Sequence, residues 1–573
     1  MSLLAIRGLT IRYDGETVVD GVDLAVERGA SVGLVGESGS GKSQCALAVL
    51  GLLPKRATMR GSIEFDGRQL AGAGQKALDE IRARRIGIVF QDPMQALNPY
   101  LRIGTQLGQI LRSHGLADRR EAHARVVEML ARVGLPDPER QFAAWPHELS
   151  GGMRQRAMIA SALIAEPDLL IADEPTTALD VTVQVQVLDL LERVRADTAL
   201  LLITHDLGIV AGYCERMTVL EKGRVVDAGS TTSLFRSPGH RHTRDLIAAA
   251  PRVDRGEPPA PVASGTVLSV GNAAVEFGDL RVVDDVSFAV GAGETVAIVG
   301  ESGSGKTSLV RAVLGLVPLA TGRVVYAGDA LARGVDKRAL AVRRDLQLVF
   351  QDPMSALDPQ MRVQAIVAEP LVVHEPRLDV KGRQERIVAV LEKVGLDERF
   401  LRRYPHQLSG GEAQRVCIAR ALVLEPKVLV CDEAVAALDG SVRLQVLALL
   451  REVQRETGLS IIFISHDLAV VRAISHRALV MYSGRLVELA ESGALFGSPR
   501  HPYTQALIAA VPVPDPVLAP RPALLPGEAP SLVTPPPGCA FHPRCPVAQT
   551  VCRAESPPLR NVGGTQVACH LAE

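Results

Sequence analysis

Short apolar runs separated by amphipathic stretches dominate this chain of 573 residues. Runs such as Ala30–Val35 and Leu200–Thr204 consist mostly of aliphatic and β-branched residues, which is typical of strands buried on both faces of a parallel sheet. Many of the stretches between them have apolar residues at helical spacing. This alternation predicts an α/β fold built on a mostly parallel sheet.

Two further patterns add to this core. Gly8–Val26 and Gly61–Gly67 alternate apolar and polar residues, as antiparallel strands do, whereas Asp118–Gly134 has the period of a helix. We therefore expect a sheet core that carries a small antiparallel part and a helical insert.

The whole arrangement occurs twice. Val89–Pro99 recurs as Val349–Pro359, and Leu169–Asp180 recurs as Val428–Asp439. A repeat of this length is a duplicated domain rather than a solenoid. A stretch rich in Pro and Gly separates the copies, as a linker does. The predicted organisation is a first domain over 1–250, a linker over 251–266, a second domain over 267–512 and a C-terminal extension over 513–573.

Composition excludes some partners. The net charge of −1 gives no electrostatic footprint for nucleic acid. No uninterrupted apolar run reaches the ~18–20 residues that span a bilayer. Arg7 comes too early in the N-terminal sequence for a signal peptide. We expect a protein that stays inside the cell unless a partner holds it at a membrane.

Two loops carry the clearest chemistry. The segments GESGSGKS (Gly36–Ser43) and GESGSGKT (Gly300–Thr307) each follow an apolar run and fit the phosphate-binding pattern G-x-x-x-x-G-K-[ST]. Glycines let backbone N–H groups approach phosphates, the lysine reaches the β- and γ-phosphates, and the hydroxyl ligates Mg²⁺. The predicted nucleotide-binding residues are Gly36, Ser38, Gly39, Ser40, Gly41, Lys42 and Ser43, and Gly300, Ser302, Gly303, Ser304, Gly305, Lys306 and Thr307.

Acidic and polar residues stand at the ends of other apolar runs. Because α/β ligands bind at the carboxyl ends of parallel strands, Asp173 and Asp432 are expected to hold Mg²⁺ beside the Ser43 and Thr307 hydroxyls. The residues that follow, Glu174 and Glu433, are the predicted bases that activate water. Predicted γ-phosphate contacts are His205 and His466, and predicted contacts to Mg²⁺ or the attacking water are Gln91 and Gln351.

Each copy also contains an LSGG sequence just before a helical pattern. Ser150, Gly151 and Gly152 in the first copy, and Ser409, Gly410 and Gly411 in the second, would form another helix N-terminus that binds an anion. Each copy would then have two phosphate-binding features, the G-x-x-x-x-G-K-[ST] loop and the LSGG segment. The simplest interpretation is that these two features bind different nucleotides. The copies would then pair head to tail within the chain, so that no second copy of the chain is needed.

These motifs together resemble the ATP-binding cassette (ABC) ATPases. Walker A, Gln loop, LSGGMRQR or LSGGEAQR, Walker B and the switch histidine are each present twice. The resemblance implies two tandem P-loop NTPase domains, each with a RecA-like core, an antiparallel β subdomain and a helical subdomain. It implies that Tyr13 and Phe277 stack on adenine. Neither copy lacks its Glu or His, so both sites are expected to hydrolyse ATP.

Four cysteines lie near the C-terminus: Cys539, Cys545, Cys552 and Cys569. The short pairs that announce structural zinc are absent, and the spacing supports a metal site without choosing the metal. The tail GC-x5-CP-x6-C after HPYTxxLIxAxP resembles the oligopeptide and dipeptide importer ATPases, which implies a [4Fe–4S] cluster with a structural role. The other cysteines, beside apolar residues, are expected to be core residues.

The importer resemblance also implies partners. The chain would be the ATP-hydrolysing subunit of a peptide importer at the cytoplasmic face of the inner membrane. Two transmembrane permease subunits would dock near Gln91–Leu101 and Gln351–Met361, and an extracytoplasmic binding protein would deliver the substrate. The alternative is a soluble tandem ABC ATPase that acts on the ribosome or nucleic acid. Ribosome-recycling members carry N-terminal iron–sulfur clusters, whereas this chain begins directly with a strand pattern.

Overall fold

The structure is a computed structural model of the chain. It describes residues 2–573 except 177–179, 196, 251, 255–257, 261, 263–264, 335–337, 437, 439, 519–524 and 528–529. The chain forms two compact units. The first comprises Met1–Ala250 and the described part of Pro512–Pro522, and the second comprises the described parts of Pro251–Val511 and Ala523–Glu573.

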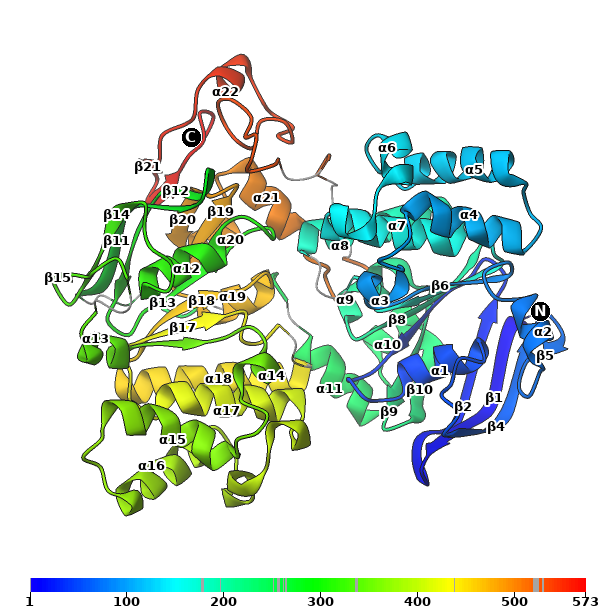
Figure 1. The fold of residues 1–573 in the computed structure, drawn as a ribbon, viewed down its shortest axis with the longest axis horizontal. Helices are drawn as coiled ribbons and strands as arrows, with labels where there is room; N and C mark the ends of the chain where they lie inside the picture. The colour runs from blue at the N-terminus through cyan, green and yellow to red at the C-terminus, as the bar shows by residue number, and fades with distance from the viewer. Residues whose placement is uncertain are drawn as a thin grey trace. The chain divides into compact units, whose positions relative to one another are not determined.

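The first unit contains two sheets (Figure 1). Its central sheet has the strand order β10-β9-β3-β8-β7-β6, and all neighbours pair in parallel except β9 and β10. The second sheet, β2-β1-β4-β5, is antiparallel. The strands are β1 (Ser2–Tyr13), β2 (Glu16–Glu27), β3 (Ser31–Val35), β4 (Ala57–Phe65), β5 (Arg68–Gln69), β6 (Ile86–Val89), β7 (Leu169–Asp173), β8 (Ala199–Thr204), β9 (Arg216–Glu221) and β10 (Arg224–Ser230).

Helices cover the central sheet, and α4, α5 and α6 gather into a separate helical part of this unit (Figure 1). The helices are α1 (Lys42–Val49), α2 (Gln75–Asp79), α3 (Pro93–Ala96), α4 (Ile103–Ser113), α5 (Arg119–Arg132), α6 (Pro138–Ala143), η1 (Pro146–Glu148), α7 (Gly151–Leu163), α8 (Val181–Arg195), α9 (Leu207–Tyr213), α10 (Thr231–Arg236) and α11 (Arg241–Ala249).

The second unit repeats this plan. Its antiparallel sheet is β12-β11-β14-β15, and its central sheet is β16-β17-β18-β13-β19-β20-β22-β21. The strands are β11 (Thr266–Phe277), β12 (Leu280–Gly291), β13 (Thr295–Val299), β14 (Thr321–Tyr326), β15 (Asp329–Ala330), β16 (Leu346–Val349), β17 (Val428–Asp432), β18 (Ser460–Ile464), β19 (Arg477–Tyr482), β20 (Arg485–Glu491), β21 (Arg560–Val562) and β22 (Thr565–Val567).

The helices of the second unit follow the same order as those of the first. They are α12 (Lys306–Leu314), α13 (Leu340–Asp345), α14 (Pro353–Ala356), α15 (Val363–His374), α16 (Val380–Lys393), η3 (Glu398–Arg402), η4 (Pro405–Gln407), α17 (Gly410–Leu422), α18 (Gly440–Thr457), α19 (Leu468–Ile474), α20 (Ser492–Gly497), α21 (Pro502–Ala509) and α22 (Thr550–Ala554).

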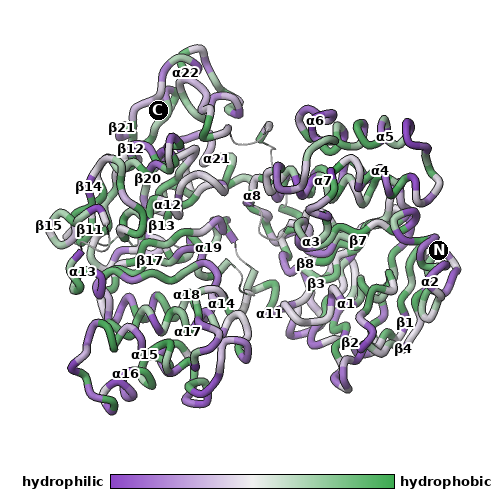
Figure 2. The backbone as a smooth tube through the Cα atoms, in the orientation of Figure 1, coloured by the Kyte–Doolittle hydropathy of each residue, from purple (hydrophilic) through white to green (hydrophobic). Residues whose placement is uncertain are grey.

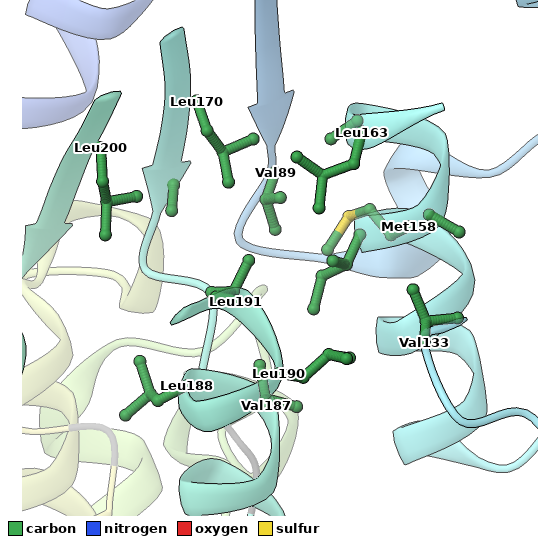
Figure 3. Close-up of a cluster of buried hydrophobic side chains, with 14 of the residues drawn as sticks. Val89, Val133, Met158, Leu163, Leu170, Val187, Leu188, Leu190, Leu191 and Leu200 are labelled. Atoms are coloured by element: carbon green, nitrogen blue, oxygen red, sulfur yellow. The ribbon is translucent and has the colours of Figure 1, made fainter. Parts of the chain in front are cut away.

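Hydrophobic burial holds the helices on the sheets. The central strands are apolar along most of their length (Figure 2), and every residue of β3 and β7 is buried. In the first unit, Leu170 and Leu200 from the sheet meet Met158 and Leu163 of α7 and Leu191 of α8 in one buried cluster (Figure 3). Apolar burial of this kind, at about 25 cal/mol per Å² of surface removed from water, holds α7 and α8 against the sheet.

The predicted fold class is confirmed. The α/β cores, the antiparallel sheets and the helical inserts all form, and each occurs in both units. At the C-terminus, β22 pairs antiparallel with β20, so the end of the chain extends the central sheet of the second unit. Thr266, placed at the end of the predicted linker, already lies in β11, and part of that linker falls outside the described residues.

Candidate functional site

The loop between β3 and α1 is shaped to surround a small anion. Gly41 adopts φ +97°, a conformation that L side chains rarely accept, and α1 begins at the next residue. Lys42 curls over the loop, because its Nζ donates to the carbonyls of Gly36 (2.9 Å) and Glu37 (2.8 Å). The ammonium and the helix N-terminus therefore both face the loop, which favours phosphate binding.

The start of this loop has no room for a side chain. A Cβ on Gly36 would lie 2.4 Å from the Leu220 carbonyl oxygen, and a Cβ on Gly300 of the second unit would lie 2.2 Å from that of Met481. Any larger residue at either position would have to displace backbone. The glycines of the motif are thus required by close packing as well as by backbone angles.

The structure brings Ser43 and Asp173 together, as predicted. The Ser43 hydroxyl donates to Asp173 Oδ1 at 3.0 Å. Burial raises the pKa of Asp173, and the hydrogen bond from Ser43 opposes this shift. Hydroxyl and carboxylate oxygens are the ligands that Mg²⁺ prefers, so this pair fits a magnesium ion beside the phosphate loop.

The Glu174 carboxylate contacts two side chains that follow the ends of two other strands. Gln91, which follows β6, donates its Nε2 to Glu174 Oε2 at 3.0 Å. His205, which follows β8, places Nδ1 at 3.2 Å from Glu174 Oε1. Glu174 itself follows β7, so parallel pairing of β6, β7 and β8 delivers all three side chains to one edge. A carboxylate held from two sides is well placed to orient a water molecule.

The second unit reproduces this geometry. Lys306 Nζ donates to the carbonyls of Gly300 and Glu301, each at 2.8 Å, and the Thr307 hydroxyl donates to Asp432 Oδ1 at 3.2 Å. Gln351 and His466 reach Glu433 at 2.7 and 3.4 Å. Burial raises the pKa of Asp432, as it does for Asp173.

Contact with His466 favours the ionised form of the Glu433 carboxyl group. Burial alone would raise the pKa of Glu433, but the hydrogen bond and charge of His466 outweigh it, so this pKa is lowered. The carboxylate is therefore ionised at neutral pH, as a group that accepts a proton from water must be.

The LSGG segments start helices, as predicted. Ser150 accepts a hydrogen bond from the Met153 N–H at 3.2 Å and begins α7. Ser409 accepts from the Glu412 N–H at 3.3 Å, and the Glu412 carboxylate accepts from the Ser409 N–H at 2.7 Å. The second segment is thus a complete capping box, whereas Met153 stands at the corresponding position of the first.

Tyr13 and Phe277, the two residues predicted to stack on adenine, have different surroundings. The Tyr13 hydroxyl donates to Gln44 Oε1 at 2.5 Å, and the Arg56 guanidinium lies over its ring at 5.7 Å. Phe277 is 51% exposed at the end of β11. Each ring comes at the end of the first strand of its antiparallel sheet.

Cys539 is affected by the other three C-terminal cysteines. Burial raises the pKa of Cys539, a hydrogen bond to the Phe541 backbone opposes this, and the charges of Cys552, Cys569 and Cys545 raise it further. Yet within the described residues no group of three or more His, Cys, Asp or Glu side chains stands close enough to hold one metal ion. The other cysteines, Cys45, Cys214, Cys417 and Cys431, are buried.

Sequence reasoning missed two features of the site. Glu174 and Glu433 adopt φ values of +47° and +49°, a backbone strain that often accompanies function. In the second unit, Arg544 forms an ion pair with Glu301 of the phosphate loop. No short stretch of sequence indicates either feature. The positive φ of Glu174 and Glu433 arises at the edge of a sheet, and the Arg544–Glu301 pair joins residues that are distant in sequence.

Over the described ranges, no helix is both long and apolar enough to cross a bilayer.

Comparison with known families agrees with this site. The family described as "ABC transporter" matches residues 19–177 and 283–436. The family described as "Oligopeptide/dipeptide transporter, C-terminal region" matches residues 487–552. Each of the two phosphate loops lies within one of the first family's matches, and Cys539, Cys545 and Cys552 lie within the second.

Curated relatives match nearly the whole chain. A protein of Pectobacterium atrosepticum named "Glutathione import ATP-binding protein GsiA" is 41% identical over 565 residues, covering 90% of each chain. A protein of Agrobacterium fabrum named "Peptidoglycan transport ATP-binding protein YejF" is 44% identical over 528 residues, covering 89% of this chain and 96% of that protein. The GsiA protein of Escherichia coli K12 is 39% identical over 582 residues, covering 92% and 93%.

Proposed function

Because this chain belongs to the ABC transporter family, we propose that its two cassettes hydrolyse ATP to drive import of a peptide-class substrate. The observation that carries the proposal is the glutamate that directly follows β7 or β17 and contacts a glutamine and a histidine in both units. The relatives named as import proteins support the transport class. A tandem ATPase that acts on ribosomes or nucleic acid is not favoured.

The residues divide the hydrolysis of ATP between them. Lys42 and the loop N–H groups bind the phosphates, and Ser43 with Asp173 would hold Mg²⁺, which neutralises charge on the phosphate oxygens. Glu174 accepts a proton from the attacking water, while Gln91 and His205 orient its carboxylate. The same roles fall to Lys306, Thr307, Asp432, Glu433, Gln351 and His466 in the second unit.

Each nucleotide is proposed to be shared by the two cassettes. The phosphate loop already uses the helix N-terminus of its own α1 or α12, so a second helix N-terminus at Ser150 or Ser409 is available to another nucleotide. Lys42 would share ATP with Ser409–Gly411, and Lys306 with Ser150–Gly152. Tyr13 and Phe277 would stack on the two adenines.

A test of the assigned bases replaces each glutamate by its amide. Glu174→Gln and Glu433→Gln each lower steady-state ATP turnover and leave ATP bound. The double variant falls about 100-fold or more, as expected when a general base is lost. Glu166→Gln is the matched control, because Glu166 has a similar φ of +54° away from the site. Unchanged phosphate release in the double variant would refute the role.

We propose that permease subunits dock on the helical side of each cassette. In the second unit a groove of about 600 Å³ opens there, and its lining includes Phe350, Ser355, Pro370 and Val373. Apolar side chains reach solvent, with Phe350 at 40% and Val373 at 52% exposure. In the first unit, Met94 and Tyr100 are exposed in the corresponding loop. Such a concave apolar surface suits a short helix of a membrane partner, which would hold this chain at the cytoplasmic face.

An extracytoplasmic binding protein would deliver the substrate.

Copurification tests this partner. With candidate permease subunits coexpressed, Val373→Glu places a charge in the groove and reduces recovered permease at least tenfold. Val380→Glu, on an 82% exposed residue of α16 outside the groove lining, retains it. Equal recovery with both variants, or recovery of ribosomes without permease, would contradict the proposal.

We further propose that Cys539, Cys545, Cys552 and Cys569 bind an iron–sulfur cluster. In support, the charges of neighbouring cysteines of this set help to raise the pKa of Cys539 and of Cys545. A cubane is wider than a single ion, so its thiolates lie farther apart than the ligands of one metal. When bound, the cluster would supply four iron–thiolate bonds that fix the extension.

Metal analysis of anaerobically purified protein tests the cluster. We expect brown protein with iron and sulfide near a 4:4 ratio per chain. Cys552→Ser loses colour and iron, whereas Cys214→Ala, a change at a core cysteine of the first unit, retains both. Stoichiometric zinc in the wild-type protein would contradict this assignment.

A further inference from the structure

The cysteine-rich extension reaches into the phosphate loop of the second unit. Arg544, one residue before Cys545, donates Nη1 to Glu301 Oε2 at 2.7 Å and Nη2 to Glu301 Oε1 at 3.1 Å. Glu301 is the second residue of the GESGSGKT loop, and its own carbonyl accepts from Lys306 Nζ. One side chain of the extension is therefore two contacts away from the lysine that binds phosphate.

A second contact holds the same loop residue by its backbone. The Glu301 N–H donates to the Tyr503 hydroxyl at 2.9 Å. Tyr503 lies on α21 and packs against Tyr482 and Phe541, with ring centroids 4.6 and 5.4 Å away. Phe541 belongs to the extension, so the tyrosine and the arginine form one support for the loop.

The two charged residues of this support, Arg544 and Glu301, are both buried. Arg544 is 4% exposed and Glu301 is 5% exposed. Burial alone would lower the pKa of Arg544, but the hydrogen bond and charge of Glu301 raise it overall. When one partner of a buried ion pair is removed, the other charge is left without compensation, so breaking such a pair is costly. The Glu301 carboxylate therefore depends on the guanidinium for its position.

The first unit differs in sequence at the corresponding positions. Its loop has the same sequence up to the last residue, but the HPYT segment of the second unit is HRHT in the first, so that His242 stands in place of Tyr503. The extension follows only the second copy. Glu37, which corresponds to Glu301, is also more exposed than Glu301.

We propose that Arg544 is a positioning residue for the second nucleotide site, so that the C-terminal extension sets ATP affinity at Lys306 and not at Lys42. The inference rests on the proposed function in that it needs a nucleotide at the second phosphate loop. This role would make the two nucleotide sites differ in ATP affinity, although both contain the same motifs. The chemical link is the Arg544–Glu301 pair, which holds the loop that forms the phosphate cradle.

Nucleotide titration tests this one site at a time. A Gly36→Val background closes the first loop, and a Gly300→Val background closes the second, because each new side chain would collide with backbone. Binding of a fluorescent ATP analogue to the full-length protein is then measured. Arg544→Met weakens binding about tenfold in the Gly36→Val background and leaves it unchanged in the Gly300→Val background.

Three matched variants separate positioning from general damage. Arg544→Lys keeps the charge without the bidentate geometry and gives an intermediate loss. The double change Glu301→Gln with Arg544→Met removes both charges and recovers binding to within about threefold of the parent. Ser556→Ala cuts a different link to the extension, the hydrogen bond that Ser556 accepts from Arg485 at 3.0 Å, and binds like the parent.

The outcomes distinguish this inference from the proposed function. If Arg544→Met binds like its Gly36→Val parent, or if the double change is as weak as Arg544→Met, the positioning role is wrong and the ATPase assignment stands. If the Gly36→Val parent binds no nucleotide at all, the second site itself is wrong, and the inference falls with it.

Discussion

Both candidate sites depend on the contacts of one glutamate, Glu174 or Glu433, which directly follows β7 or β17. Its carboxylate meets an amide from one neighbouring strand end and an imidazole from another, at 3.0 and 3.2 Å in the first unit. Only parallel pairing of three consecutive strands brings those ends to one edge. The apolar clusters beneath, drawn for the first unit in Figure 3, hold those strands in register. Packing beneath the sheet edge thus determines where this carboxylate lies.

The two units share this geometry but not its surroundings. In the first, the ring of Tyr13 is held by Gln44 and faced by Arg56. In the second, Phe277 is open, while Arg544 and Tyr503 support the phosphate loop. The two units therefore contain the same candidate site residues, while the contacts around these residues differ. Such changes are a physical route by which two ATP sites in one chain come to differ in affinity.

Much of this was predictable from the sequence, for identifiable reasons. Buried strands such as Leu169–Asp173 are almost pure apolar runs with a polar residue at the sheet edge, so the contact of Ser43 with Asp173 followed from topology. The contact of Gln91 with Glu174 was not predicted, because Gln91 was expected to contact Mg²⁺ or the attacking water. The strands β21 and β22 were not predicted, because three-residue strands have no readable period. The pairing of Arg544 with Glu301 was also missed. It joins residues 243 positions apart, and only tertiary packing brings them together.

The central claim is that each ATP is shared between one cassette's phosphate loop and the other cassette's LSGG segment. Disulfide trapping in a Glu174→Gln, Glu433→Gln chain tests it most directly. Ser38→Cys is combined either with Gly410→Cys in the opposite cassette or with Gly151→Cys in the same one, and peptides are identified by mass spectrometry. The account predicts that ATP with Mg²⁺ promotes a disulfide between the introduced thiols of the first pair and not of the second. A disulfide in the same-cassette pair, or none in the opposite-cassette pair with ATP bound, would contradict it.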